Sequence, residues 1–219
     1  MLKINAVLFD LDGTLVDSNQ LLIDSFKHTI EYFFPSLKFT KNDYIHMIGP
    51  SLEETFSNLT NNDEIITKMI ELFRNYYIDH EQESIKIYPN VISSLKELKK
   101  MKIQTGIVTT KFKSSALPSI EMFELNKYID VYVYLDSVEY AKPHPEPIHK
   151  AISLLKDPQM VMMIGDNPSD ILSGKNVKIL TCGVDWSYKK DLLKKTDPDF
   201  WMTDFNQLSM IIKKYNKEA

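Results

Sequence analysis

Val7-Leu8-Phe9-Asp10-Leu11-Asp12-Gly13-Thr14-Leu15 stands close to the beginning of the chain and carries its strongest local signal. The apolar residues from Ala6 to Phe9 are partly β-branched or aromatic and are bounded by Gly13, which predicts a fully buried strand of a parallel sheet. Open α/β sheets bind ligands beyond the carboxyl ends of their strands. Asp10 and Asp12 therefore stand where a ligand would bind, although an acidic turn is the alternative for an Asp-Gly pair alone.

The composition is that of an ordinary soluble globular chain: 219 residues, 43% hydrophobic and 26% charged, with a net charge of −4. This acidic balance argues against nucleic acid as a partner, because nucleic-acid-binding domains carry a basic face. The single cysteine, Cys182, excludes an intramolecular disulfide and a multi-cysteine metal site. Arg74 is the only arginine, so lysines, hydroxyls and backbone N–H groups would have to meet any phosphate.

Targeting and membrane signals are not found in the sequence. The N-terminus lacks the charged segment, apolar core and cleavage site of a signal peptide. No apolar run approaches the roughly 20 residues of a membrane span. We therefore expect a cytoplasmic protein with no membrane contact. The oligomeric state stays open, and a monomer is compatible with the sequence.

The periodicity of apolar residues divides the chain into two kinds of segment. Helical spacing and helix caps extend from about residue 16 to residue 84, without a strand. Strands and helices then alternate, with strands expected at 103–109, 131–135, 160–164 and, last in the core, 179–182. Such alternation implies right-handed crossovers and a parallel sheet. The sequence thus predicts an α/β fold, a doubly wound (Rossmann-like) parallel sheet with a small inserted all-helical cap domain. The predicted boundaries are 1–15 and 85–219 for the core and 16–84 for the cap.

Polar residues follow the core strands at the ends that a parallel sheet brings to one edge. They are Asp10 and Asp12, then Thr109-Thr110-Lys111, then Lys142, and finally Gly165-Asp166 with Asp170. Carboxylates gathered at one edge repel each other and raise one another's pKa, a conflict that a hard cation such as Mg²⁺ resolves. Lys142 adds a compact positive charge and Thr109 a hydroxyl donor. The set indicates phosphoryl transfer, which depends mostly on positioning and charge neutralisation.

Four motifs thus occur in order: Phe9-Asp10-Leu11-Asp12-Gly13-Thr14, Thr109, Lys142 and Gly165-Asp166-x-x-x-Asp170. They resemble the four motifs of the haloacid dehalogenase-like hydrolases, and the resemblance covers nearly the whole chain, helical cap included. It implies that Asp10 is a nucleophile that forms an aspartyl-phosphate, and that Asp12 is the general acid/base. It implies that Thr109 and Lys142 hold the phosphoryl oxygens. Mg²⁺ would be bound by Asp10, the backbone carbonyl of Asp12 and Asp166. Asp170 would either be a further ligand or contact the ligands without binding the ion.

A narrower resemblance concerns the substrate. The segments that carry it are Ile48-Gly49-Pro50-Ser51-Leu52, Gly106 to Lys111, Lys142-Pro143-His144-Pro145-Glu146-Pro147 and Gly165-Asp166-Asn167. They resemble the pyrophosphatase subgroup linked to dephosphorylation of the carrier protein HPr, which is close to the phosphoglycolate phosphatases. His144, where relatives usually have Asp, and Asn176-Val177-Lys178, where they have a small Asn-Ala-Gly turn, are departures that bear on the substrate. The resemblance implies inorganic pyrophosphate as substrate, with contacts from Gly49, Thr110 and Lys111. Lys111 and Arg74 are the candidates for its second phosphate.

Other functions stay open at this point. The alternatives are a phosphoglycolate or sugar-phosphate phosphatase and a phosphomutase, which would pass the aspartyl-phosphate to a substrate hydroxyl. A signalling receiver is a different class, but its phosphorylated Asp follows a later strand in a chain about half as long.

Some residues are given no role at the site. We interpret two tryptophans as packing residues and two lysine pairs as solvated surface: Trp186, Trp201 and the lysine pairs at 189–190 and 194–195.

Overall fold

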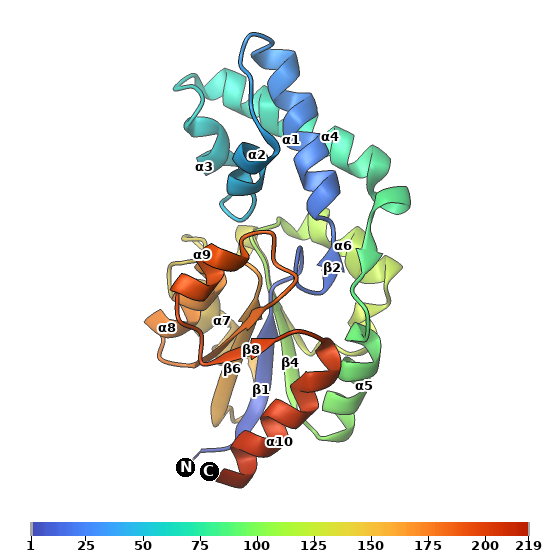
Figure 1. Ribbon diagram of the computed structural model, residues 1–219, viewed down its shortest axis with the longest axis vertical. Helices are drawn as coiled ribbons and strands as arrows, with labels where there is room; N and C mark the ends of the chain where they lie inside the picture. Colours follow the sequence, from blue (N-terminus) through green and yellow to red (C-terminus); the bar gives the residue numbers. More distant parts are fainter. Residues whose placement is uncertain (1, 219) are drawn as a thin grey trace. The chain divides into compact units, whose positions relative to one another are not determined.

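The fold centres on a six-stranded parallel sheet in the order β5-β4-β1-β6-β7-β8 in the computed structural model, which describes residues 2–218 (Figure 1). The strands are β1 (Ile4–Phe9), β4 (Gln104–Val108), β5 (Val131–Val133), β6 (Met160–Gly165), β7 (Leu180–Val184) and β8 (Phe200–Met202). β1 lies between β4 and β6, and its residues from Ala6 to Phe9 are fully buried. A strand that is apolar on both faces suits this interior position. The predicted α/β fold is confirmed.

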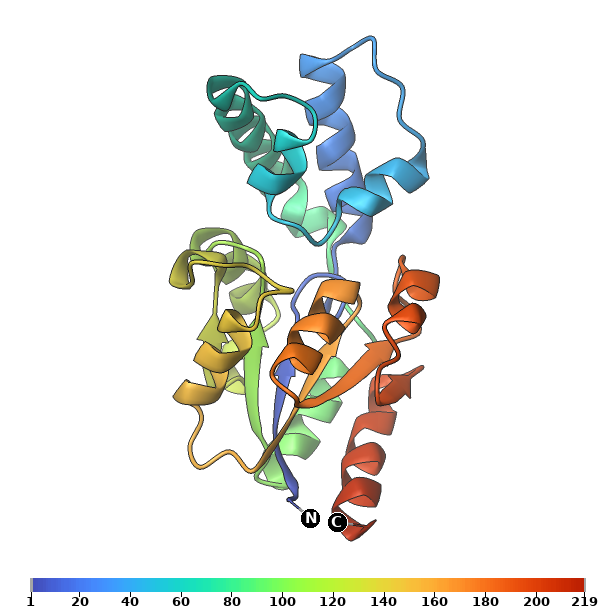
Figure 2. The ribbon, with the colours of Figure 1, turned by 90° about the vertical axis from the view of Figure 1, so that its left-hand side faces the viewer.

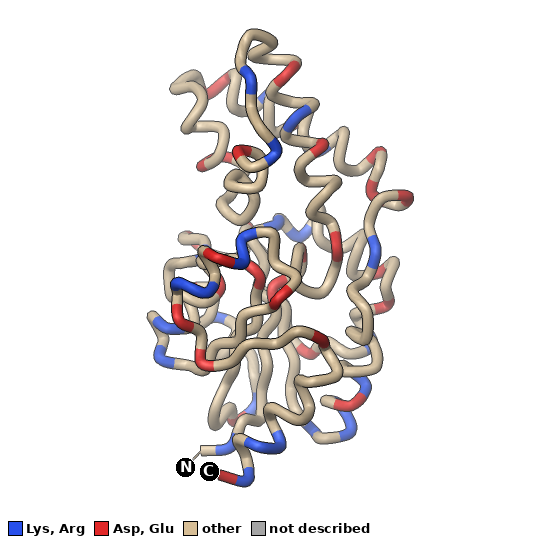
Figure 3. Tube along the Cα trace, in the orientation of Figure 1, with Lys and Arg blue, Asp and Glu red and all other residues tan. Residues whose placement is uncertain are grey.

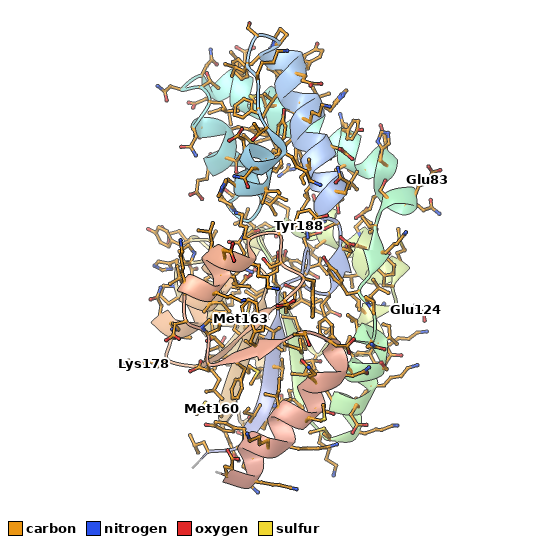
Figure 4. The ribbon with its side chains drawn as sticks, in the orientation of Figure 1. Glu83, Glu124, Met160, Met163, Lys178 and Tyr188 are labelled. Atoms are coloured by element: carbon orange, nitrogen blue, oxygen red, sulfur yellow. The ribbon has the colours of Figure 1, made fainter. Side chains whose placement is uncertain are left out.

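Helices cover both faces of the sheet. Helices α5 (Val91–Lys100) and α10 (Leu208–Glu218) lie on one side, and α7 (Glu146–Leu154) and α8 (Pro168–Asn176) lie on the other (Figures 1 and 2). The buried layer under α7 joins residues of four strands to the helix, and Met163 of β6 lies within it (Figure 4). Helices α6 (Lys113–Met122) and α9 (Lys190–Lys195) follow β4 and β7. At the first residue of β1, the Asn216 side chain of α10 accepts from the backbone N–H of Ile4 (2.7 Å) and donates to the backbone oxygen of Ile4 (3.0 Å).

Residues Asp17–Lys86 form a second compact unit, separate from the unit of Met1–Val16 and Ile87–Ala219. Its helices are α1 (Asn19–Phe33), α2 (Lys41–Met47), α3 (Leu52–Ser57) and α4 (Asp63–Ser84). Phe26 packs between Phe56 and Phe73, with ring centroids 5.9 and 4.6 Å away, and this aromatic cluster forms the centre of the unit. Figure 3 shows basic and acidic residues interspersed along both units. Within residues 2–218, every helix is too short or too polar to cross a membrane.

Two expectations about strands are wrong. The segment 16–84 was expected to contain no strand, but β2 (Val16–Asp17) pairs with β3 (Lys86–Ile87) in a two-stranded sheet where the chain passes between the units. The strand expected at 179–182 is β7, yet it is not the last, because β8 continues the sheet beyond it. Strands of two or three residues are too short to show an alternating pattern. Their formation depends on the neighbouring strand that supplies the hydrogen bonds.

Candidate active site

The register of the central strands brings three of the predicted site residues to one edge. Phe9 of β1 pairs with Ile107 of β4 on one side and with Ile164 of β6 on the other. The backbone N–H of the next residue, Asp10, donates to Ile164 O over 3.0 Å, so the first turn beyond the strand is fixed to the sheet. The residues immediately after β1, β4 and β6 are Asp10, Thr109 and Asp166. They come together at the edge where open α/β sheets bind ligands.

Lys142 joins the carboxylates at this edge. Its ammonium group donates to Asp10 Oδ1 (2.8 Å), to Asp170 Oδ1 (2.5 Å) and to the backbone oxygen of Val108 (2.7 Å). The Lys142 side chain is only 2% exposed and that of Asp170 only 1%. An ammonium group has three donors, and these bonds use all of them. A phosphoryl oxygen that binds Lys142 would therefore have to share or replace one of these acceptors.

Asp170 is held from two sides. Its Oδ1 accepts from Lys142, and its Oδ2 accepts from the backbone N–H of Asn167 (3.0 Å) in a capping box at the start of α8. A Cβ atom at Gly165 would lie 2.3 Å from the Asp170 carboxyl group, so the close approach requires glycine there. Both carboxylate oxygens of Asp170 thus already accept a hydrogen bond, one of them from Lys142.

Asp166 is held by the loops that follow β1 and β7. Its Oδ1 accepts from the Thr14 hydroxyl (3.2 Å), and its backbone oxygen accepts from the buried Ser187 hydroxyl (2.5 Å). Gly13 has φ +75°, and a Cβ atom at this position would lie 2.3 Å from Asp166 Oδ2. The glycine of the Asp-Gly pair therefore serves both the turn and the space for a carboxylate.

Charge and burial conflict in this group. Burial raises the pKa of Asp10 to about 7, against the opposing influence of Lys142. Burial, together with the charges of Asp10 and Asp170, holds the pKa of Asp166 well above its usual range. Burial acts to lower the pKa of Lys142, but the two neighbouring carboxylates outweigh it and raise that pKa. Carboxylate oxygens of Asp10, Asp166 and Asp170 lie within 4.8 Å of one another, a spacing that a divalent cation could bridge.

The side chain of Asp12 faces a different lysine. Asp12 Oδ1 accepts from Lys111 Nζ over 3.0 Å, and the two side chains are 13% and 14% exposed. The backbone N–H of Lys111 donates to the Thr109 hydroxyl oxygen (3.2 Å). The loop after β4 thus brings Thr109 and Lys111 to the acidic group that follows β1. The sequence analysis predicted that Lys111 contacts the substrate, but it did not predict the bond from Lys111 to Asp12.

Three other expected substrate contacts stay predictions. Gly49, with φ +113°, lies between α2 and α3 in the unit of residues 17–86. Arg74 belongs to the same unit and lies on α4. Thr110 is half-buried next to Thr109.

The loop after β7 supplies residues that the sequence analysis missed. Trp186 Nε1 donates to the backbone oxygen of Gly13 (3.1 Å), and its ring packs against Tyr88. Lys189 is half-buried rather than solvated, and this burial lowers its pKa despite the nearby charges of Asp166 and Asp170. Tyr188 lies in the same loop (Figure 4). Their position after the next parallel strand was the available signal, because its carboxyl end meets the same edge.

Comparisons with known proteins agree with this geometry. The family model described as haloacid dehalogenase-like hydrolase matches residues 7–184. Pyrophosphatase PpaX of Bacillus anthracis (strain A0248) is 38% identical over 218 residues, which cover 99% of this chain and 100% of that protein. A haloacid dehalogenase-like family hydrolase from Streptococcus pneumoniae superposes with a TM-score of 0.80 at 26% identity, over 95% of this chain and 98% of that one. A predicted phosphoglycolate phosphatase from Haemophilus somnus shares the fold, with a TM-score of 0.82 at 22% identity, over 95% and 97% of the two chains.

The chain belongs to the haloacid dehalogenase-like hydrolase family. Within that family it is a phosphatase, since it combines the family's fold with full-length similarity to a phosphate-releasing enzyme.

Replacing Lys142 tests the buried charge group. Lys142→Met should lower the free energy of unfolding at pH 8 by roughly 3–5 kcal/mol, the usual cost of leaving buried charges without their partner. The loss should be smaller at pH 5. Without Lys142 the pKa of Asp10 rises further above its unfolded value, so the folded protein binds more protons and its stability falls as pH rises. Urea unfolding at both pH values measures the effect.

Lys213→Met is the matched control, because it removes a lysine from an exposed pair with Glu97. Its cost should stay below about 1 kcal/mol. Equal losses at pH 5 and pH 8 for Lys142→Met would contradict the charge argument.

Proposed function

We propose that this enzyme hydrolyses inorganic pyrophosphate through an aspartyl-phosphate on Asp10, with Mg²⁺ as cofactor. The observation that carries the chemistry is the buried group in which Lys142 bonds Asp10 and Asp170 beside Asp166. The full-length similarity to pyrophosphatase PpaX supports the substrate.

The donor set suits a hard cation. Three carboxylates with close oxygens face one fully bonded ammonium group, and burial disfavours the charge of Asp10 and Asp166. Asp10 and Asp166 would hold Mg²⁺ directly, with the backbone carbonyl of Asp12, while Asp170 would orient Lys142. Bound Mg²⁺ would neutralise the phosphoryl oxygens and keep both carboxylates ionised at neutral pH.

The proposed chemistry uses two carboxylates in succession. The Asp10 carboxylate attacks phosphorus, the bond to the leaving oxygen breaks, and Asp12, which enters this step as the protonated carboxylic acid, gives its proton to that oxygen. Asp12 then removes a proton from water, which attacks the aspartyl-phosphate, releases inorganic phosphate and restores Asp10. Thr109 would donate to a phosphoryl oxygen, and Lys142 would offset the negative charge on Asp10.

Cation binding can be measured without turnover. Saturating Mg²⁺, at about 100 times its Kd, should raise the Tm by roughly 5–10 °C, which corresponds to about 2.7 kcal/mol in a chain of this size. The shift should be larger at pH 8 than at pH 6, because at the lower pH the cation has to displace a proton from Asp10. Asp166→Asn should lose most of the shift, and the exposed Asp197→Asn should keep it. An unchanged shift in Asp166→Asn would remove this residue from the metal site.

Replacement of the nucleophile gives the second test. Asp10→Asn should reduce kcat for every phosphate substrate by more than about 10⁴-fold, because a neutral amide cannot form the covalent intermediate. Wild type quenched in acid during turnover should carry phosphate on Asp10, detectable by mass spectrometry, and the variant should carry none. Asp197→Asn controls for a carboxylate-to-amide change at a fully exposed position. Substantial turnover by Asp10→Asn would assign the nucleophile to another residue.

The substrate is decided by a direct comparison. We expect kcat/KM for pyrophosphate to exceed that for 2-phosphoglycolate and for sugar phosphates by at least about 10-fold in Mg²⁺, a ratio that corresponds to about 1.4 kcal/mol of transition-state binding. A preference for phosphoglycolate would discard pyrophosphate and leave the aspartyl-phosphate chemistry in place.

A further inference from the structure

Two lysine–carboxylate pairs stand at the carboxyl edge of the sheet, and they differ in depth. Lys142 bonds the proposed nucleophile Asp10 with its own side chain 2% exposed, whereas Lys111 bonds Asp12 with its side chain 14% exposed. The more buried pair contains Asp10, which would receive the phosphoryl group. The less buried pair contains Asp12, which would protonate the leaving oxygen.

The Lys111 pair is built into the fold. The backbone N–H of Lys111 donates to Thr109 Oγ1 (3.2 Å), and its carbonyl accepts from the N–H of Leu135 (2.9 Å). The next turn is fixed as well, since Lys113 N donates to Asp136 Oδ1 (3.1 Å). With its backbone held at both ends, Lys111 spends less conformational entropy on reaching Asp12 than a lysine on a mobile loop would.

From this geometry we infer that Lys111 positions Asp12 and selects leaving groups that depart as compact anions. The leaving oxygen has to reach the Asp12 carboxyl group, and Lys111 Nζ lies 3.0 Å from it, so an anionic leaving group enters the field of the ammonium group. An ammonium group can donate to several acceptors at once, so a departing anion can share Lys111 with Asp12. This inference rests on the proposed function of Asp12.

The chemical consequence concerns where charge develops. When the phosphoryl moves to Asp10, negative charge grows on the leaving oxygen and on the group behind it. Inorganic phosphate and glycolate both leave with further anionic oxygens, and a nitrophenolate leaves with one delocalised charge. Lys111 therefore stabilises the transition state for the first two more than for the third.

Four single variants and a double variant test the inference. Lys111→Met should reduce kcat/KM for pyrophosphate by about 100-fold and for p-nitrophenyl phosphate by about 10-fold or less. Lys111→Arg keeps the cation and should recover most of the pyrophosphate activity. With p-nitrophenyl phosphate, the double variant Asp12→Asn/Lys111→Met should lose little more than Asp12→Asn alone, because with this substrate Lys111 acts mainly through Asp12. Lys113→Met is the control for losing an exposed lysine two residues away.

The outcomes separate cleanly. A selective loss on pyrophosphate with strong non-additivity supports the inference. Equal losses on both substrates, multiplying losses in the double variant, or an effect no larger than that of Lys113→Met would overturn it. If wild type prefers phosphoglycolate, the proposed substrate fails but the same series is run with phosphoglycolate, whose leaving group is also anionic. Circular dichroism and Tm for each variant show that the losses are not caused by unfolding.

Discussion

The buried ammonium group of Lys142 is the constraint around which the site is arranged. It bonds Asp10, Asp170 and the end of β4, so it ties three segments of the sheet edge together and lets carboxylates approach within a few ångströms. Such a group is costly to bury, since each charge loses its hydration. The fold offsets that cost with full hydrogen bonding. The surplus of negative charge that remains is what suits this edge to the proposed Mg²⁺.

The parallel sheet converts distance along the chain into proximity. Residues 10, 109 and 166 share one edge because β1, β4 and β6 run in the same direction in adjacent positions, and Lys142 comes from the segment after β5, the strand next to β4. The loops add the finer placement. Gly13 and Gly165 leave room for the carboxyl groups of Asp166 and Asp170, and Trp186 fixes the Gly13 carbonyl from the loop after β7. The site is therefore a property of the whole core unit rather than of one motif.

Sequence reasoning reached the parts of this design that depend on local pattern. The buried run before Asp10 predicted a central strand, and the order of polar residues after the strands predicted which of them meet at the sheet edge. It did not reach features that depend on tertiary neighbours. β8 has three residues and forms against β7, and the burial of Lys189 depends on a loop whose sequence is polar. The bond from Lys111 to Asp12 joins the loops after β4 and β1, and residue spacing within one segment of the chain cannot predict such a contact.

The position of β1 in the sheet affects how the chain folds during translation. β1 leaves the ribosome before both of its partners, since β4 begins at Gln104 and β6 at Met160, so one side of β1 has no partner strand until β6 is made. Pairing across such separations is slow because the loop must close before the contacts form. The nascent chain thus carries an exposed apolar strand, a species prone to aggregation. Under the proposed mechanism the chemistry needs Asp166, so chains that end before this residue would be inactive.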